Sequence, residues 1–134
     1  MTRSHCKKIL SNGDIYIGDN VNGKRTGFGK YAWNSGEWKG DIFAGEWLNE
    51  NRMGKGIYIH SNGDQYDGNF INSKRTGKGK YVWAQKGDWY DGDWVDGKMM
   101  GFGKYFWSHN GNWYEGEWVD NKKTRGCIFS FVRR

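Results

Sequence analysis

Proline is absent from the 134 residues, and cysteine occurs only twice, as Cys6 and Cys127. The missing proline and the missing collagen period exclude a polyproline rod, a collagen-like chain and Pro-rich disorder. There is no Cys-x-x-Cys pair and no Cys/His cluster, so the sequence predicts no zinc site. If the molecule is elongated, the two cysteines lie too far apart for a disulfide within one chain.

Long hydrophobic runs are missing as well. Residues 1–10 lack the apolar stretch of a signal peptide, and no segment approaches the length of a membrane span. The chain also contains no Asn-x-Ser/Thr sequon. Together with the cysteine usage, these absences predict a cytoplasmic, reducing compartment.

Glycine and aromatic residues are abundant, with 22 Gly, nine Trp, eight Tyr and seven Phe. Frequent glycine with periodic aromatics is typical of short strands joined by tight turns. The length predicts about one domain. The net charge is +6, and both signs are interspersed along the chain, which favours an ordinary solvated surface over a dedicated site for polyanions.

The chain is built from a repeated unit, seen most clearly in residues 87–107 (GDWYDGDWVDGKMMGFGKYFW). Versions of it begin at Gly13, Gly40, Gly63, Gly87 and Gly111, so the period is about 23 residues, and insertions such as residues 36–39 fall between units. Within a unit the alternation has period two, and no helical stripe fits. One strand face therefore holds Tyr90, Gly92 and Trp94, and the other holds Asp91, Asp93 and Val95.

Each unit predicts one β-hairpin of two short strands. A lone hairpin is marginal in water, so the hairpins must stack edge to edge. The predicted fold class is all-β: a single-layer antiparallel β-meander of about five stacked hairpins, or about ten strands, with an elongated shape roughly 45 Å long. Residues 1–12 are a basic lead-in, either loose or paired at its end with the first unit. The repeat domain covers residues 13–134, with repeats near 13–35, 40–62, 63–86, 87–110 and 111–132.

Stacking places equivalent positions in ladders across the sheet. The first strands give Tyr16, Phe43, Tyr66, Tyr90 and Tyr114, and then Asn20, Trp47, Phe70, Trp94 and Trp118. The second strands give Tyr31, Tyr58, Tyr81, Tyr105 and Phe129, and then Trp33, His60, Trp83, Trp107 and Phe131. A row of glycines between the first two ladders leaves room for a ring against the backbone. The last unit has Arg125-Gly126-Cys127 in place of Gly-x-Gly, and residues 128–132 either cap the array or offer an edge strand to a partner.

Two motifs resemble the MORN (membrane occupation and recognition nexus) repeat family. Residues 114–118 read YEGEW, and Gly97-Lys98 precedes Gly101-Phe102-Gly103 as in the family's GKxxGxG turn; residues 23–29 match the same turn. The resemblance covers about residues 13–131. It implies a twisted, curved β-meander with a groove, usually non-catalytic, in scaffolds of cytoskeletal, ciliary and membrane-contact assemblies. Other members are attached to lipid kinases or methyltransferases, and lipid binding has often been proposed for the family.

Patterns that suggest chemistry have a structural explanation. Two Gly-x-x-x-x-Gly-Lys segments, at Gly18 and Gly92, lack the Ser/Thr of a phosphate-binding loop, and no helix follows them. The acidic pairs Asp91/Asp93 and Glu115/Glu117 favour a charged strand face over a metal or catalytic site, with Lys30, Lys80 and Lys104 as partners on adjacent strands. We expect no enzyme activity, no metal, no cofactor and no nucleic-acid partner.

The aromatic surplus predicts a protein-binding groove, because one layer cannot bury 24 aromatic rings on both faces. The predicted function is a non-catalytic scaffold that binds an extended or helical segment of another protein. The predicted protein-binding residues are Trp38, Tyr66, Trp89, Tyr90, Trp94, Phe106, Trp113, Tyr114 and Trp118. The best candidates for contact, because they lie outside the ladders, are Trp38, Trp89, Phe106 and Trp113.

Basic residues at one hairpin edge support an alternative function, a peripheral membrane module that binds anionic phospholipid. The residues concerned are Lys24, Arg25, Lys74, Arg75, Lys98, Lys122 and Lys123. A further alternative is a regulatory subunit of an enzyme complex, with catalysis supplied by a partner chain. Homo-oligomers through the end strands are left open.

Overall fold

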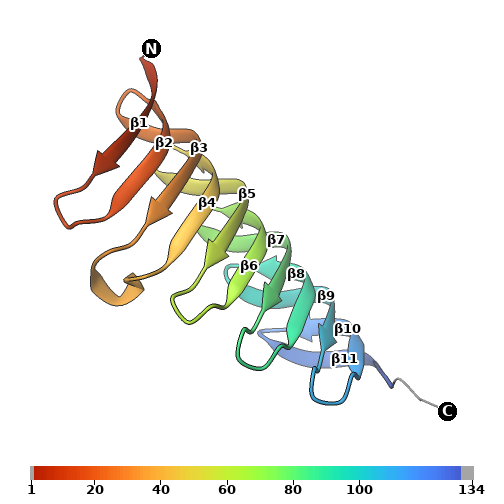
Figure 1. Ribbon diagram of the computed structural model, residues 1–134. Coiled ribbons are helices and arrows are strands. Elements are labelled where there is room, and N and C mark those ends of the chain that lie inside the picture. The colour runs from red at the N-terminus through yellow and green to blue at the C-terminus, as the bar shows by residue number, and fades with distance from the viewer. Residues whose placement is uncertain (1, 131–134) are drawn as a thin grey trace.

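The computed structural model describes residues 2–130 as one sheet whose strand order follows the chain (Figure 1). All neighbouring strands are antiparallel, and the sheet is not closed. The strands are β1 (Arg3–Ile9), β2 (Ile15–Val21), β3 (Lys24–Ala32), β4 (Ile42–Leu48), β5 (Asn51–Ile59), β6 (Gln65–Ile71), β7 (Lys74–Val82), β8 (Trp89–Val95), β9 (Lys98–Phe106), β10 (Trp113–Val119) and β11 (Lys122–Phe129). A short 3-10 helix, η1 (Gly36–Trp38), occupies the insertion after the first hairpin.

The sheet has eleven strands where the sequence predicted about ten. The extra strand is β1, which pairs along its whole length with β2, from Arg3 opposite Val21 to Ile9 opposite Ile15. The lead-in is therefore part of the sheet over residues 3–9. Its strand carries no repeat motif, which is why its full pairing was not predicted. Cys6 on β1 and Cys127 on β11 are both free and lie on the first and last strands, as expected.

Each repeat is one hairpin, as predicted, and each closes with a two-residue turn in which both residues have positive φ. Asn22 and Gly23 have φ of 52° and 78°, and Asp96 and Gly97 have 48° and 83°. Such primed turns match the right-handed twist of the flanking strands, and Asn-Gly and Asp-Gly adopt them with little strain. In the other three hairpins the second residue is not glycine; it is Glu50, Ser73 or Asn121.

Paired glycines allow an aromatic ring to lie on the backbone of its own hairpin. Gly68 faces Gly79, and a Cβ on Gly79 would overlap the ring of Tyr66. The Tyr66 hydroxyl passes over this pair and donates to the Asn69 carbonyl at 2.8 Å. The equivalent hydroxyls of Tyr16, Tyr90 and Tyr114 donate to the carbonyl three residues ahead at 2.7 to 3.0 Å.

The hydrophobic core lies on one face of the sheet, here called the inner face. It consists of the predicted ladders: Tyr16, Phe43, Tyr66, Tyr90 and Tyr114; Trp47, Phe70, Trp94 and Trp118; and Tyr31, Tyr58 and Tyr81, with Met99 between them. Rings of successive hairpins meet edge to face, for example Tyr90 and Trp118 at 5.1 Å between centroids. All five hairpins have a register shift between the paired glycines and the turn, and the hairpins bend along their length (Figure 1).

The fifth hairpin corrects one predicted ladder. Gly126, and not Cys127, pairs with Gly116 and makes room for the Tyr114 hydroxyl. Ile128 therefore lies opposite Tyr114 on the inner face, and Phe129 lies on the other face against Trp113. The last repeat is one residue shorter after its turn, and a slip of one residue exchanges the two faces of a strand. The predicted ladder position of Phe131, and the rest of residues 131–134, lie outside the described residues.

The glycine pairs generate a stability prediction. Gly79→Ala places a methyl group where the Tyr66 ring lies, so we expect the free energy of unfolding to fall by about 1–3 kcal/mol, or more if the ring is displaced. Chemical denaturation measures the change.

The control is Gly23→Asn, since a Cβ there meets nothing within 4 Å and Asn121 already has a similar φ in the fifth hairpin. Equal losses in the two variants would contradict the packing explanation.

Candidate functional site

Carboxylates connect each of the first four repeats to the loop that follows it, and three of the four, Asp14, Asp41 and Asp88, are buried. Asp14 accepts hydrogen bonds from the Tyr31 hydroxyl at 2.6 Å and from the Asn34 N–H at 2.8 Å. Asp41 does the same with Tyr58 at 2.6 Å and with the Ser61 N–H at 2.8 Å. Asp64 and Asp88 repeat the arrangement with Tyr81 and Tyr105. These bonds fix the tyrosine ladder to the loops at one edge of the inner face.

Sequence reasoning missed these carboxylates, although a signal was available. The dipeptide Gly-Asp recurs at residues 13–14, 40–41, 63–64 and 87–88, and the fifth unit has Gly111-Asn112 instead. The tyrosine is lost from the same unit, because Ile128 takes its place opposite Tyr114. Both members of the hydrogen-bonded pair are therefore replaced together.

Burial by itself raises the pKa of the Asp88 carboxyl, but hydrogen bonds from Ser108 and Tyr105 outweigh it, and the pKa lies below its ordinary value. The pKa of Asp14 is lowered in the same way, by Tyr31, the Asn34 N–H and Ser35 acting against burial. For the buried Tyr58 hydroxyl, burial and the bond to Asp41 raise the pKa well above its ordinary value. Asp14 and Asp88 are thus held ionised as hydrogen-bond acceptors.

Three arginines lie over the rings of the inner face. The Arg25 guanidinium is 4.8 Å from the Trp47 ring centroid, and that of Arg75 is 4.8 Å from Trp94. The Arg52 guanidinium lies among four rings, with Tyr58 at 5.2 Å. Burial lowers the pKa of both Arg52 and Arg75. Arg25 and Arg75, which the sequence placed in a basic hairpin edge, direct their guanidinium groups onto the inner face, because each hairpin has a register shift before its turn.

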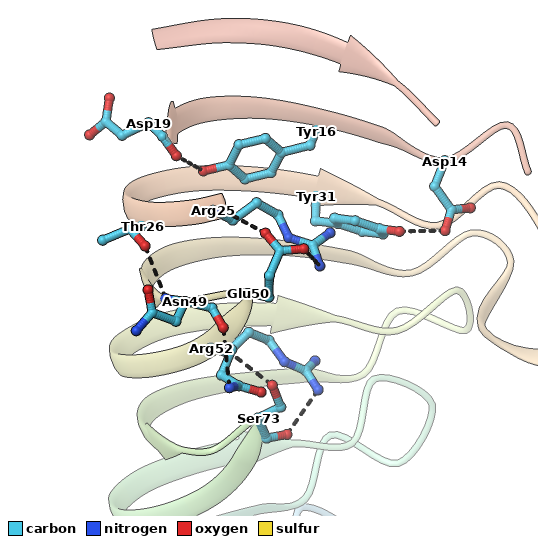
Figure 2. A network of polar contacts seen from close by, with 11 residues as sticks. Asp14, Tyr16, Asp19, Arg25, Thr26, Tyr31, Asn49, Glu50, Arg52 and Ser73 are labelled. Carbon is cyan, nitrogen blue, oxygen red and sulfur yellow. Dashed lines mark hydrogen bonds and ion pairs between the residues drawn. The ribbon is translucent and has the colours of Figure 1, made fainter. Parts of the chain in front are cut away.

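The turns of the second, third and fourth hairpins contact the arginine of the hairpin before them, and Figure 2 shows the first two of these contacts. Glu50 accepts from the Arg25 N–H at 2.5 Å and forms an ion pair with the Arg25 guanidinium at 3.1 Å. One repeat further on, Ser73 accepts from the Arg52 N–H at 3.1 Å, and its carbonyl accepts from the Arg52 guanidinium at 2.8 Å. In the fourth repeat the Gly97 carbonyl accepts from the Arg75 guanidinium at 2.9 Å.

The inner face is hollowed near its middle. The hollow has a volume of about 310 Å³ and is lined by Trp33, Trp38, Arg52, Tyr58, His60, Tyr66, Phe70, Ser73, Lys74, Arg75 and Gly97. Two ladder positions that hold tryptophan in neighbouring repeats are smaller here, His60 and Phe70, which leaves room for the opening. Trp38, from the insertion η1, stands beside it with half of its surface exposed.

A second hollow of about 500 Å³ lies on the inner face of the last two hairpins. It is lined by Trp83, Met99, Tyr105, Trp107, Trp118, Asn121, Lys122 and Lys123. The Lys123 ammonium lies 4.7 Å from the Trp107 ring centroid. Lys123 is thus exposed but lies over the rings of the inner face.

The outer face carries a continuous row of mostly apolar side chains, one from each strand. Cross-strand pairing joins Ile9, Ile15, Ala32, Ile42, Ile59, Gln65, Val82, Trp89, Phe106, Trp113 and Phe129. Trp89 stacks on Phe106 at 5.4 Å, and the Lys80 ammonium lies 4.6 Å from the Trp89 ring centroid. Trp89, Phe106 and Trp113 are therefore partly covered and lie on the face opposite the hollow that Trp38 lines.

Five predicted protein-binding residues are buried and hold the sheet together. Their exposed fractions are at most 4%, and they are Tyr66, Tyr90, Trp94, Tyr114 and Trp118. Each ring lies on a glycine pair or donates its indole N–H to the preceding hairpin, as Trp94 does to the Gly79 carbonyl at 2.9 Å. A side chain used in this way leaves a partner little surface to contact, so we remove these five from the candidate contact residues.

Four predicted lipid-binding lysines do form an exposed row at the turn end of the hairpins. Each pairs across the hairpin with an aliphatic residue: Lys24 with Val21, Lys74 with Ile71, Lys98 with Val95 and Lys122 with Val119. Ile71, Val95 and Val119 are between 46% and 49% exposed. The turn end thus presents alternating cations and aliphatic groups.

The acidic pairs lie on the outer face opposite lysines. Lys80 pairs with Asp67 and Asp91, and Lys104 pairs with Asp91 and Glu115, as the sequence predicted. The same prediction for Lys30 is wrong, because Lys30 lies between Ile17 and Ala44. Among residues 2–130, no group of three or more His, Cys, Asp or Glu is arranged to hold a metal ion. Within the same residues, no helix has the length and apolar character needed to cross a membrane.

Comparison with known protein families identifies the repeat. The family model described as MORN repeat matches five segments, residues 16–38, 43–65, 66–87, 90–108 and 114–124. The matches follow the five hairpins and leave β1 outside. Among curated proteins, none matches the chain with significant similarity.

The buried carboxylates generate a prediction about pH. Because the pKa of Asp88 is lower in the folded protein than in the unfolded chain, its contribution to stability is present above the unfolded pKa, about 3.9, and is lost as the pH falls below it. We expect Asp88→Asn to be less stable than the parent at pH 7 and to lose less stability between about pH 5 and pH 3.

Denaturant titrations at a series of pH values test this. Asp120→Asn, at an exposed turn, is the matched control and should follow the parent. If Asp88→Asn also follows the parent, the carboxylate does not have the assigned role.

Proposed function

This chain belongs to the MORN repeat family, whose repeats are generally protein- or membrane-interaction modules and not typically catalytic, and from this premise we propose that its inner face binds a segment of a partner protein. The protein then acts as a scaffold or adaptor. The setting proposed is a cytoskeletal, ciliary or membrane-associated assembly in the cytoplasm.

The observation that carries the proposal is the hollow at the middle of the inner face. The hollow has a volume of about 310 Å³ and is open to solvent. Its lining combines indole and phenol rings with two arginines. Aromatic and arginine side chains are enriched among the residues that dominate binding energy at protein interfaces. A segment lying along the inner face would also reach the second hollow, where Trp107 and Lys123 offer the same combination.

Trp38 is the side chain that distinguishes this binding mode from its alternatives. It lines the hollow, and with 51% of its surface exposed it contributes little to the core. It comes from η1, in an insertion that no other repeat has in this form. Specificity for a partner would thus depend on a residue that the shared repeat scaffold does not need.

We expect Trp38→Ala to weaken partner binding by about 30-fold or more, the effect of losing a hot-spot residue, while leaving the thermal unfolding midpoint nearly unchanged. Quantitative affinity purification from cell extract, repeated with Trp38→Ala, measures the loss for each enriched protein.

Trp89→Ala is the control, because that ring lies on the outer face against Phe106. Proteins retained by Trp38→Ala but lost by Trp89→Ala would contradict the inner-face assignment and favour the outer row.

A second candidate function is binding to an anionic membrane surface through the turn end of the hairpins. The observation in its favour is the exposed row of lysines, each beside an aliphatic residue such as Ile71 or Val95. Cations beside apolar groups are suited to a lipid interface, where the charge meets the head groups and the aliphatic side chain enters the boundary region.

This candidate predicts co-flotation with vesicles that contain anionic lipid. Flotation should fall as salt is added and should be lost when Lys24, Lys74 and Lys98 are all changed to Glu. Vesicles of neutral lipid are the control. Absence of flotation at low salt, or flotation that the triple variant retains, would eliminate it.

A further inference from the structure

Arg25 has an internal carboxylate partner, and this pair serves as a reference within the molecule. Glu50, the second residue of the next hairpin turn, accepts from the Arg25 N–H and pairs with its guanidinium at 3.1 Å. The guanidinium lies over the Tyr31 and Trp47 rings, so the carboxylate neutralises a cation that faces the aromatic core. A charge removed from water needs such a partner.

Arg52 and Arg75 occupy the equivalent position in the next two repeats but have no such partner. The turn residue that corresponds to Glu50 is Ser73 beside Arg52 and Gly97 beside Arg75. Each guanidinium donates to a turn carbonyl, at 2.8 and 2.9 Å, and within residues 2–130 no carboxylate lies at ion-pair distance from either.

Both unpaired guanidinium groups line the same hollow. A guanidinium has five N–H donors, and one accepted bond leaves most of them available. The surrounding rings stabilise the cation in part, through the electron-rich faces of their π systems. An anion entering the hollow would meet two cations already fixed by packing, so little ordering is required on binding.

We propose that the hollow binds an acidic segment of a protein. Two carboxylates of that segment pair with Arg52 and Arg75, as Glu50 pairs with Arg25. This inference rests on the proposed function and adds the chemistry of the partner. Arg52 and Arg75 lie on β5 and β7, two strand spacings apart, so the two carboxylates are required at a separation of about 10 Å.

The rings around the two arginines favour a peptide over a lipid head group. Trp33, Trp38 and Tyr58 wall the hollow and provide an apolar surface for the side chains that flank an acidic residue. A head group presents phosphate and hydroxyl groups but no flanking side chains. The exposed lysines at the turn end offer phosphate a more accessible surface than the recessed arginines do.

The test supplies the missing carboxylates from within the chain. Ser73→Glu and Gly97→Glu each recreate the Glu50 arrangement beside the arginine of the preceding hairpin. Ser73 and Glu50 have φ of 66° and 76°, so the backbone at the turn already suits glutamate. Gly97 has φ of 83°, close to the value that Glu50 already adopts, and a Cβ there meets only the Arg75 guanidinium, at 3.6 Å, so the double variant is expected to fold.

The control is Gly23→Glu, which adds the same charge at the same turn position of the first hairpin. Within the described residues that turn contacts Thr2 and no arginine, a Cβ on Gly23 meets nothing within 4 Å, and Gly23 lines neither hollow of the inner face. Any general effect of negative charge or of glutamate in the turn appears in this variant as well as in the other two.

The measurement is selection of random dodecamer peptides on the immobilised parent protein, followed by fluorescence titration of the selected peptides against each variant. We expect the selected peptides to be enriched in Asp and Glu and to lose about tenfold or more in affinity for the Ser73→Glu/Gly97→Glu variant. Their affinity for Gly23→Glu should remain within about twofold of the parent value.

Selected peptides that lack acidic residues, or that bind the double variant as tightly as the parent, would overturn this inference and leave the proposed function standing. Failure to select any peptide would count against both. Vesicles containing phosphoinositide form a separate arm: if they bind the parent and not the double variant while no peptide binds, the hollow takes a lipid phosphate and the acidic-segment proposal is wrong.

Discussion

The structure depends on the approach of aromatic rings to their own backbone. A single-layer sheet has no second layer to cover its core, so the apolar area must be buried by side chains that lie flat on the strands carrying them. The glycine pairs, such as Gly68 with Gly79, make this possible because any Cβ there would overlap a ring or the facing backbone. The register shifts, the bend of the hairpins and the position of the arginines all follow directly after these pairs.

Much of this arrangement could be predicted because it repeats. Alternation with period two and the turn residues predicted the hairpins, the stacking order and most of the inner ladders. Three features depended on information that the repeat does not carry. Strand β1 has no motif, the slip that exchanges Ile128 and Phe129 is visible only in the pairing, and the inward direction of Arg25 results from a register shift. The candidate site was predicted less well, because the sequence pattern marks the aromatic residues of the ladders most clearly. Those residues build the core, and five of them were predicted as contact residues although they are buried.

Departures from the repeat have local structural explanations. Asn20 stands where other repeats have Trp or Phe and donates to the Cys6 sulfur at 3.1 Å, since the strand before it is a single strand and not a hairpin. Glu50 and Ser73 replace a turn glycine and bond to the preceding hairpin. His60 and Phe70 replace larger rings and open the hollow. The shared positions build a scaffold, and the substituted ones make one part of its surface different from the rest.

The turn-to-hairpin bonds also give the array a direction. In every case the turn of one hairpin contacts the hairpin before it: Glu50 reaches Arg25, Ser73 reaches Arg52, Gly97 reaches Arg75 and Asn121 reaches Met99. Each of these turns is thus held by the hairpin on its amino-terminal side, and the two directions along the sheet are not equivalent. The first and last strands of the array therefore present different surfaces to anything that joins the sheet at its ends.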